Sequence, residues 1–241
     1  MRVCLIPLKT EPRSPSANLE RLKQRLEANA PAKPDLICLP ECTLTGYLYH
    51  EADFERFAEP IPGPTTRLMG ELAAIYSAGL CFGLLEKTEM GVYNSAVLLD
   101  RQGNILLIHR ENEEAPPFLN GKIVRSVSTE WGDLSVLICG DLFHARVTDR
   151  LSSSVNWVIL PMSRSFSGAS PDPTRWISEE RGVYLDAVKA IRKTAFITNA
   201  LEIGTNEPAF GGALIVGANG EIIAESPHGT DQALIWDFRA P

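Results

Sequence analysis

The sequence has few of the residues that build disulfide frameworks and metal sites. Its 241 residues include five cysteines, an odd number, and four histidines that lie far apart at positions 50, 109, 144 and 228. Cys38 and Cys42 are close in sequence, but no second cysteine pair follows them, so a structural zinc site is not expected. We therefore predict reduced thiols, no metal and no cofactor.

Positive charge and long apolar runs are also scarce. The formal net charge is −7, with 23 Lys and Arg against 30 Asp and Glu. No basic face is therefore available to neutralise a phosphate backbone, and nucleic acid is not an expected partner. The N-terminal stretch MRVCLIPLKTEPR contains an apolar run of only about seven residues, too short for a signal sequence or a membrane span. We expect a cytoplasmic protein that does not bind membranes and acts on a small-molecule substrate.

The first part of the chain alternates between strand-type and helix-type patterns. Apolar runs at 2–8, 35–41 and 80–86 predict strands, and the middle run suits a strand that is buried on both faces. Between them, SANLERLKQRLEAN (16–29) has leucines along one face and predicts a helix, and a second helix is predicted at 65–78. This β-α-β-α-β order indicates an α/β fold.

The second half repeats this scheme from LSVLICG (134–140) to TAFITNA (194–200). Each half then ends in a predicted hairpin, and SAVLLDRQGNILL (95–107) aligns without a gap with GALIVGANGEIIA (212–224). Turn chemistry alone can produce part of this match, but the hairpins occupy the same place in both halves. We expect one domain over residues 1–241, an α/β four-layer α-β-β-α sandwich with an internal pseudo-twofold repeat.

Two of the apolar runs end in residues that can carry chemistry. DLICLPE ends at Glu41, and SVLICGD contains Cys139 just before Gly140. Ligands in open α/β sheets gather beyond the carboxyl ends of strands, so Glu41 and Cys139 can share a site. A carboxylate that accepts the thiol proton would generate the nucleophilic thiolate, and Gly140 would let the backbone aim amide N–H groups at an oxyanion. The alternative is an inert core cysteine, which is the commoner role in an apolar strand.

These residues lie in stretches that resemble the nitrilase, or carbon–nitrogen hydrolase, superfamily. LICLPECTLTGY (36–47) resembles the family's first motif, LSVLICGDLF (134–143) its third, and GGALIVGANGEIIAE (211–225) its closing hairpin. The resemblance implies an α-β-β-α sandwich and a Glu–Lys–Cys catalytic set, with Glu41 as general base and Cys139 as nucleophile. The implied reaction forms a thioester, releases ammonia or an amine, and ends with hydrolysis of the intermediate.

A glutamate occupies the position of the family's lysine. In the family the second motif is a strand that ends in Arg-Lys, whereas GNILLIHRE ends at Glu111. The resemblance implies that the lysine stabilises the negative charge of the tetrahedral intermediate. A unit charge pair at about 4 Å and an effective dielectric constant of about 20 is worth about 4 kcal/mol. Reversing the sign of this charge can therefore slow the reaction by about a thousandfold or more.

Three arrangements can compensate for this exchange. Arg110 can turn inward and supply the cation, although its guanidinium differs in reach from an ammonium. Lys122 can enter from the loop that follows. Glu41 and Glu111 can share one proton, which leaves an acid for the leaving group. The alternative is that the acidic loop ENEE is solvated and Glu111 points to water.

Further residues are predicted to border the substrate. The resemblance implies a second structural glutamate in the loop at 111–121, which Glu113 or Glu114 matches. Ser163 and Arg164, at the strand end ILPMSRSF, can select a carboxylate-bearing substrate, although Arg164 is as readily a surface residue. The predicted site consists of Cys139, Glu41 and Glu111 as catalytic residues and of Arg110, Glu114, Gly140, Ser163 and Arg164 as substrate-binding residues.

The sequence therefore indicates a carbon–nitrogen hydrolase-like protein that acts on a small amide, carbamoyl compound or nitrile through Cys139. The alternative is a catalytically impaired pseudoenzyme that keeps the scaffold as a ligand-binding or regulatory protein. A thiol redox sensor has less support, because no resolving CxxC partner is present. The resemblance also implies a homodimer or a larger homo-oligomer.

Overall fold

Two six-stranded sheets form the centre of the computed structural model, which describes residues 1–165, 172–206 and 208–238. In spatial order, the first sheet consists of β14 (Leu234–Asp237), β1 (Arg2–Leu5), β3 (Leu36–Cys38), β4 (Gly79–Thr88), β5 (Gly91–Leu99) and β6 (Ile105–Arg110). The second consists of β13 (Ile222–Glu225), β12 (Ala213–Val216), β10 (Thr194–Asn199), β9 (Trp157–Met162), β8 (Gly132–Val136) and β7 (Ser126–Thr129). The short strands β2 (Lys9–Thr10) and β11 (Leu201–Glu202) pair with each other and link the two halves.

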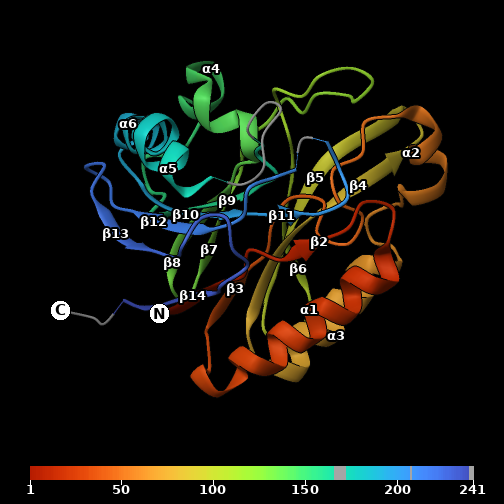
Figure 1. The fold of residues 1–241 in the computed structure, drawn as a ribbon, viewed down its shortest axis with the longest axis horizontal. Coiled ribbons are helices and arrows are strands. Elements are labelled where there is room, and N and C mark those ends of the chain that lie inside the picture. The colour runs from red at the N-terminus through yellow and green to blue at the C-terminus, as the bar shows by residue number, and fades with distance from the viewer. Residues whose placement is uncertain (166–171, 207, 239–241) are drawn as a thin grey trace.

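Helices cover the outer faces of the two sheets (Figure 1). The helical segments of the first half are α1 (Pro15–Asn29), η1 (Ala30–Ala32), α2 (Glu51–Phe57) and α3 (Pro64–Tyr76). Those of the second half are η2 (Cys139–Phe143), α4 (Ala145–Thr148), α5 (Pro173–Arg175), η3 (Trp176–Glu180) and α6 (Arg181–Ile191). The predicted four-layer α-β-β-α sandwich is confirmed.

The two sheets have the same internal order, which confirms the predicted repeat. Strands β1, β3 and β4 run parallel to one another, as do β8, β9 and β10. Each parallel set continues into an antiparallel hairpin, β5–β6 or β12–β13. In each sheet, an antiparallel edge strand pairs with the first strand of the parallel set: β14 pairs with β1, and β7 pairs with β8.

The continuous apolar runs arise because the parallel strands are covered on both faces. On β1, Val3 and Leu5 pack into the core between the sheets, whereas Cys4 packs toward the helices of the first half. Leu36 and Ile37 on β3 divide in the same way. The alternation of side chains along a strand thus supplies two apolar cores from one run of residues.

The sequence analysis missed several edge and connecting elements. These are α2, the β2–β11 pair, and the edge strands β7 and β14. They are short, and β7 and β14 have no fully buried side chain. A weak hydrophobic pattern is expected where one face of an edge strand meets solvent. Within the described part of the chain, none of the helices has the length and apolar character needed to cross a membrane.

Candidate active site

The carboxyl ends of three parallel strands place the candidate residues. The chain continues from β3 to Glu41, from β8 to Cys139 and from β9 to Ser163. Cys139 is the first residue of η2, is half-buried, and has a left-handed backbone with φ of +36°. A non-glycine residue rarely adopts this conformation unless its surroundings hold it there, and such positions concentrate at functional sites.

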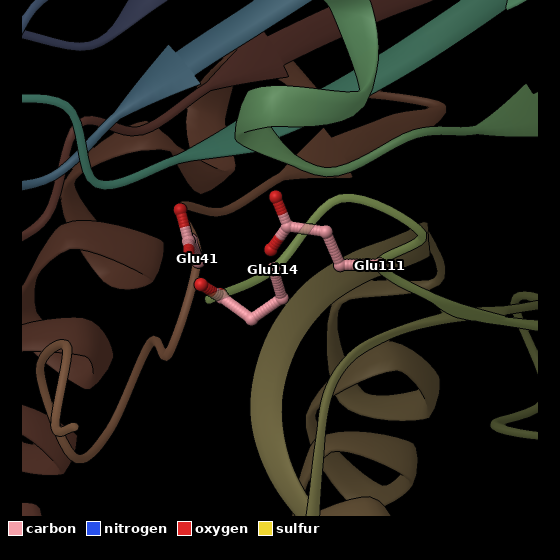
Figure 2. A group of neighbouring side chains, drawn as sticks. All are labelled: Glu41, Glu111 and Glu114. Atoms are coloured by element: carbon pink, nitrogen blue, oxygen red, sulfur yellow. The ribbon is translucent and has the colours of Figure 1, made fainter. Parts of the chain in front are cut away.

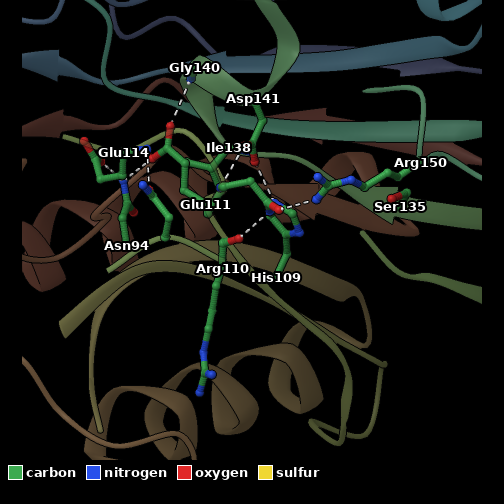
Figure 3. A network of polar contacts seen from close by, with 12 residues as sticks. Asn94, His109, Arg110, Glu111, Glu114, Ser135, Ile138, Gly140, Asp141 and Arg150 are labelled. Carbon is green, nitrogen blue, oxygen red and sulfur yellow. Dashed lines mark hydrogen bonds and ion pairs between the residues drawn. The ribbon is translucent and has the colours of Figure 1, made fainter. Parts of the chain in front are cut away.

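Asp141 holds the turn that carries Cys139. Its Oδ2 accepts a hydrogen bond from the backbone N–H of Ile138 at 3.1 Å and contacts His109 Nε2 at 2.7 Å, and its Oδ1 accepts from the N–H of Asn112 at 2.8 Å (Figure 3). Asp141 and His109 are both buried. Because His109 and Asn112 flank the end of β6, this carboxylate fixes the Cys139 turn relative to that strand.

Glu41 lies in a tightly packed position beside β4. It is 2% exposed, and a Cβ atom at Gly83 would lie 2.7 Å from Glu41 Cα. Gly83 therefore allows the backbone at Glu41 to approach the strand more closely than any other residue would. Glu41 Oε1 accepts a hydrogen bond of 2.6 Å from Asn94 Nδ2, whereas Oε2 has no hydrogen-bond partner among the described residues.

Glu111 points into the site and not to water. It is 3% exposed; its Oε1 accepts from the Gly140 N–H at 3.1 Å and its Oε2 from Asn94 Nδ2 at 2.8 Å (Figure 3). The alternative in which the ENEE loop is solvated and Glu111 points to water is therefore wrong. The Gly140 N–H, predicted to face an oxyanion, is instead occupied by the Glu111 carboxyl group.

Three carboxyl groups meet around one side-chain amide. Asn94 Nδ2 lies 2.6 Å from Glu41 Oε1, 2.8 Å from Glu111 Oε2 and 3.0 Å from Glu114 Oε2. One oxygen atom from each glutamate falls within 4.8 Å of the others (Figure 2). Glu114 Oε1 also accepts from the Tyr47 hydroxyl at 2.8 Å. Such a cluster could hold a cation, but here a nitrogen donor faces all three oxygens.

The cluster is short of hydrogen-bond donors and of positive charge. An asparagine amide has two N–H groups, so Asn94 cannot satisfy three carboxylates at once. No Lys or Arg in the described ranges forms an ion pair with Glu41, Glu111 or Glu114. This arrangement favours a proton on at least one of the three carboxyl groups.

Burial dominates the ionisation of these groups. It raises the pKa of Glu41 to about 8, with a further increase from the Glu114 carboxylate. Burial raises the pKa of Glu111 well above its usual range, and Glu41 and Glu114 add to this. The pKa of the Cys139 thiol is also raised by burial and by Glu41 and Glu111, while the charge of Arg164 opposes the increase.

These raised pKa values predict a pH-dependent effect of Glu111→Gln on stability. The folded state binds the Glu111 proton more tightly than the unfolded chain, whose glutamate pKa is about 4.3, so the free energy of unfolding falls as pH rises above that value. One such group contributes about 1.4 kcal/mol for each pH unit up to its folded pKa. The neutral glutamine variant should gain stability relative to the wild type as pH rises from about 5 to about 8, by up to about 4 kcal/mol over these three units.

Urea unfolding at the two pH values would measure this difference. The matched control is Glu89→Gln, which removes a carboxylate from an exposed turn and should not change with pH in the same way. Equal stability of the Glu111→Gln protein and the wild type near about pH 8 would show that Glu111 is ionised without cost in the folded state.

The structure does not bring the predicted replacement cations to the cluster. Arg110 Nε donates to Glu86 Oε2 at 2.7 Å, and the guanidinium lies 4.3 Å from the centre of the Tyr93 ring. Figure 3 shows the Arg110 side chain pointing away from Glu111. The prediction that Arg110 turns inward is wrong, because side chains alternate along β6. Lys122 is exposed and lines the same separate cavity as Arg110.

The remaining predicted residues divide between the site and the surface. Glu114 joins the cluster, whereas Glu113 forms an ion pair with Arg146. Ser163 lines a cavity of about 700 Å³ beside the cluster, and its backbone N–H approaches the Glu41 carboxyl closely enough to lower its pKa. Arg164 is exposed, with its guanidinium 5.6 Å from the centre of the Phe143 ring.

Sequence reasoning missed Asn94, Tyr47 and Glu202. Asn94 and Ser95 are fully buried polar residues within the strand-type run of β5, and this polar pair is a signal that the sequence does contain. Tyr47 joins two acidic groups, because its hydroxyl donates to Glu114 and its backbone N–H donates to Glu202 Oε1 at 3.0 Å. Nothing in the sequence pattern indicates the pairing of Tyr47 with Glu202.

Comparisons with known proteins agree with this fold. The family model described as carbon-nitrogen hydrolase matches residues 2–240. The probable nitrilase C965.09 of Schizosaccharomyces pombe is 25% identical over 218 residues, 86% of this chain and 76% of that protein. The omega-amidase NIT2 of Danio rerio is 22% identical over 233 residues, 91% of this chain and 81% of that protein. A mutant of the amidase from Nesterenkonia sp. AN1, shown with acrylamide added to its active-site cysteine, superposes with a TM-score of 0.82 at 17% identity, covering 99% of this chain and 93% of that chain.

Proposed function

Because the chain belongs to the carbon–nitrogen hydrolase family, we propose that it hydrolyses a small amide or carbamoyl compound through a thioester on Cys139. The observation that carries this proposal is the meeting of Cys139 and Glu41, which come from different sheets. The Cys139 thiol approaches the Glu41 carboxyl closely enough to lower its pKa, although burial raises that pKa overall. A thiol beside a base of raised pKa is an arrangement suited to nucleophilic catalysis.

The proposed reaction has two stages. Glu41 takes the proton of the Cys139 thiol, Sγ forms a bond to the substrate carbonyl carbon, and the carbonyl electrons move to oxygen. The C–N bond then breaks, the leaving nitrogen takes the proton of Glu111, the proton held by Glu41 passes to Glu111, and a thioester remains. In the second stage Glu41 takes a proton from water and the water oxygen bonds to the thioester carbon. The C–S bond then breaks, Sγ takes the proton back from Glu41, and the carboxylic acid leaves.

Glu111 is proposed to act in its neutral form in place of a lysine. Its pKa is raised by burial and by the neighbouring carboxylates, so it can hold a proton at neutral pH and donate it toward the leaving nitrogen. A carboxylic acid stabilises an oxyanion less than an ammonium does. The Gly140 N–H must also exchange its bond to Glu111 for one to the substrate oxygen, so we expect slow turnover.

This proposal predicts that hydrolysis becomes faster as pH rises through about 8. Burial raises the pKa of Glu41 to about 8, so below that pH its carboxyl group is mostly protonated and cannot accept the thiol proton. The measurement is kcat/KM for ammonia release from about pH 6 to about pH 10. A rate that is flat or falls over this range would argue against Glu41 as the base.

One observation favours a second candidate function. The hydrogen bond from Gly140 to Glu111 occupies a donor that an oxyanion would need, and it would be compatible with a ligand-binding protein that no longer turns over. In that case substrates should bind without release of ammonia. Replacement of Glu111, described in the Discussion, separates the two candidates.

A further inference from the structure

The cavity beside the glutamate cluster has an acidic wall, whereas a pocket that binds a carboxylate would need a positive charge. Its volume is about 700 Å³, and its wall includes Tyr47, Tyr49, Ser163 and Glu202. Ser163 connects the cavity to the nucleophile, because its backbone N–H lies near both the Glu41 carboxyl and the Cys139 thiol. A substrate whose amide lies at Cys139 can therefore reach past Ser163 into this cavity.

Glu202 places an acidic group in the cavity wall without a matching cation. It is 7% exposed, and its oxygens accept hydrogen bonds from the backbone N–H groups of Tyr47 at 3.0 Å and Ala209 at 3.3 Å. In the described segments no Lys or Arg forms an ion pair with it. Each carboxylate oxygen can accept a further hydrogen bond, so Glu202 retains capacity for a donor in the cavity.

The other charged groups of the wall are already neutralised. Arg13 donates to both oxygens of Asp53, at 2.7 Å and 2.6 Å. Glu11 lies 3.3 Å from the guanidinium of Arg21. Among the described residues of the wall, the charge left over is therefore that of the Glu202 carboxylate; burial raises its pKa, while the N–H groups of Tyr47 and Ala209 lower it.

Two further features indicate a ligand with a positive end. Tyr47 and Tyr49 have ring centres 6.2 Å apart in the cavity wall, and aromatic faces attract ammonium and guanidinium groups. Glu41 Oε2 and Ser163 Oγ are shielded from solvent and have no hydrogen-bond partner in the part of the chain that is described. Of these two residues, Ser163 lies in the cavity wall, where its hydroxyl can bind a polar group of the substrate.

We propose that the substrate is a small amide or carbamoyl compound that carries an ammonium or guanidinium group at its far end, bound by Glu202 beside Tyr47 and Tyr49. This inference rests on the proposed function for the position of the amide. It replaces the carboxylate-bearing substrate predicted from Ser163 and Arg164, because Arg164 does not line the cavity.

Three compounds of matched length test the proposal on the intact protein. 5-Aminopentanamide has a positive far end, hexanamide a neutral one, and adipamate a negative one. Each is tested for protection of Cys139 against alkylation by iodoacetamide, with the modified residue identified by mass spectrometry; the other four cysteines are buried. The cationic compound should protect at a concentration about tenfold lower than hexanamide, and adipamate should protect least.

Glu202→Gln should reduce the preference for the cationic compound over hexanamide to about twofold or less, while Glu89→Gln on an exposed turn should not. Equal protection by all three compounds, or best protection by adipamate, would overturn the proposal, as would protection by none. Because the wild-type preference is measured without a variant, the test does not depend on the folding of Glu202→Gln.

Ammonia release, measured in parallel, separates this inference from the proposed function. Selective protection by 5-aminopentanamide without ammonia release would support the cationic ligand and remove the hydrolase. Release that is faster from hexanamide or adipamate would support the hydrolase and remove the cationic substrate.

Discussion

A Glu111→Lys variant should release ammonia from an amide substrate about a thousandfold faster than the wild type. The ammonium would lie among the Glu41 and Glu114 carboxylates, which now share the donors of Asn94. It would also free the Gly140 N–H, which now donates to Glu111 at 3.1 Å. Both donors could then stabilise the oxyanion. The measurement is kcat for ammonia release at saturating substrate.

Two variants control for this gain. Glu111→Gln removes the negative charge but supplies no cation, so its gain should be smaller than that of lysine by about tenfold or more. Glu113→Lys makes the same change of charge two residues away, where the side chain pairs with Arg146, and should give no comparable gain. A folded Glu111→Lys protein with unchanged or lower activity would show that the glutamate does not limit the reaction.

Removal of the Cys139 thiol should abolish ammonia release in both the wild type and the Glu111→Lys variant. Cys139→Ala leaves no nucleophile to form the thioester, and Glu41→Gln should reduce the rate by about a thousandfold or more because no base remains. Both substitutions are also made in the Glu111→Lys variant, whose expected higher rate leaves enough signal to measure each loss. Thermal unfolding of each variant would show whether the fold is retained.

Cys42→Ala is the matched thiol control. Cys42 follows Glu41 directly, but it is fully buried, and burial raises the pKa of its thiol well above the usual range. Its loss should reduce the rate by less than about tenfold. If Cys42→Ala abolished ammonia release and Cys139→Ala did not, the nucleophile would be misassigned.

The strand pattern carried most of the fold prediction because both faces of the parallel strands are apolar. The same reasoning located Glu41 and Cys139 at strand ends. It placed Glu111 in the site but kept Arg110 as a candidate cation there, because the alternation of side chains along the last strand was not applied at its end. His109 is buried, so Glu111, two residues later, lies on the same face and Arg110 on the other.

The partners of Glu111 depend on pairing between distant segments. Asn94 reaches the cluster because β5 pairs with β6 in a register that places Ser95 opposite Arg110. Tyr47 and Glu202 lie where irregular segments from the two halves meet, and hydrophobic periodicity says nothing about such contacts. The charge of the cavity could therefore not be predicted from the strand-end residues alone.

Acylation by p-nitrophenyl acetate tests the central claim most directly, namely that Cys139 is a nucleophile with Glu41 as its base. This ester has a leaving group that needs no proton, so acylation does not require proton donation by Glu111. The account predicts a burst of p-nitrophenol equal to one per chain, an acetyl group mapped to Cys139, and no burst with Cys139→Ala or Glu41→Gln. Acetylation at another residue, or an equal burst in either variant, would contradict it.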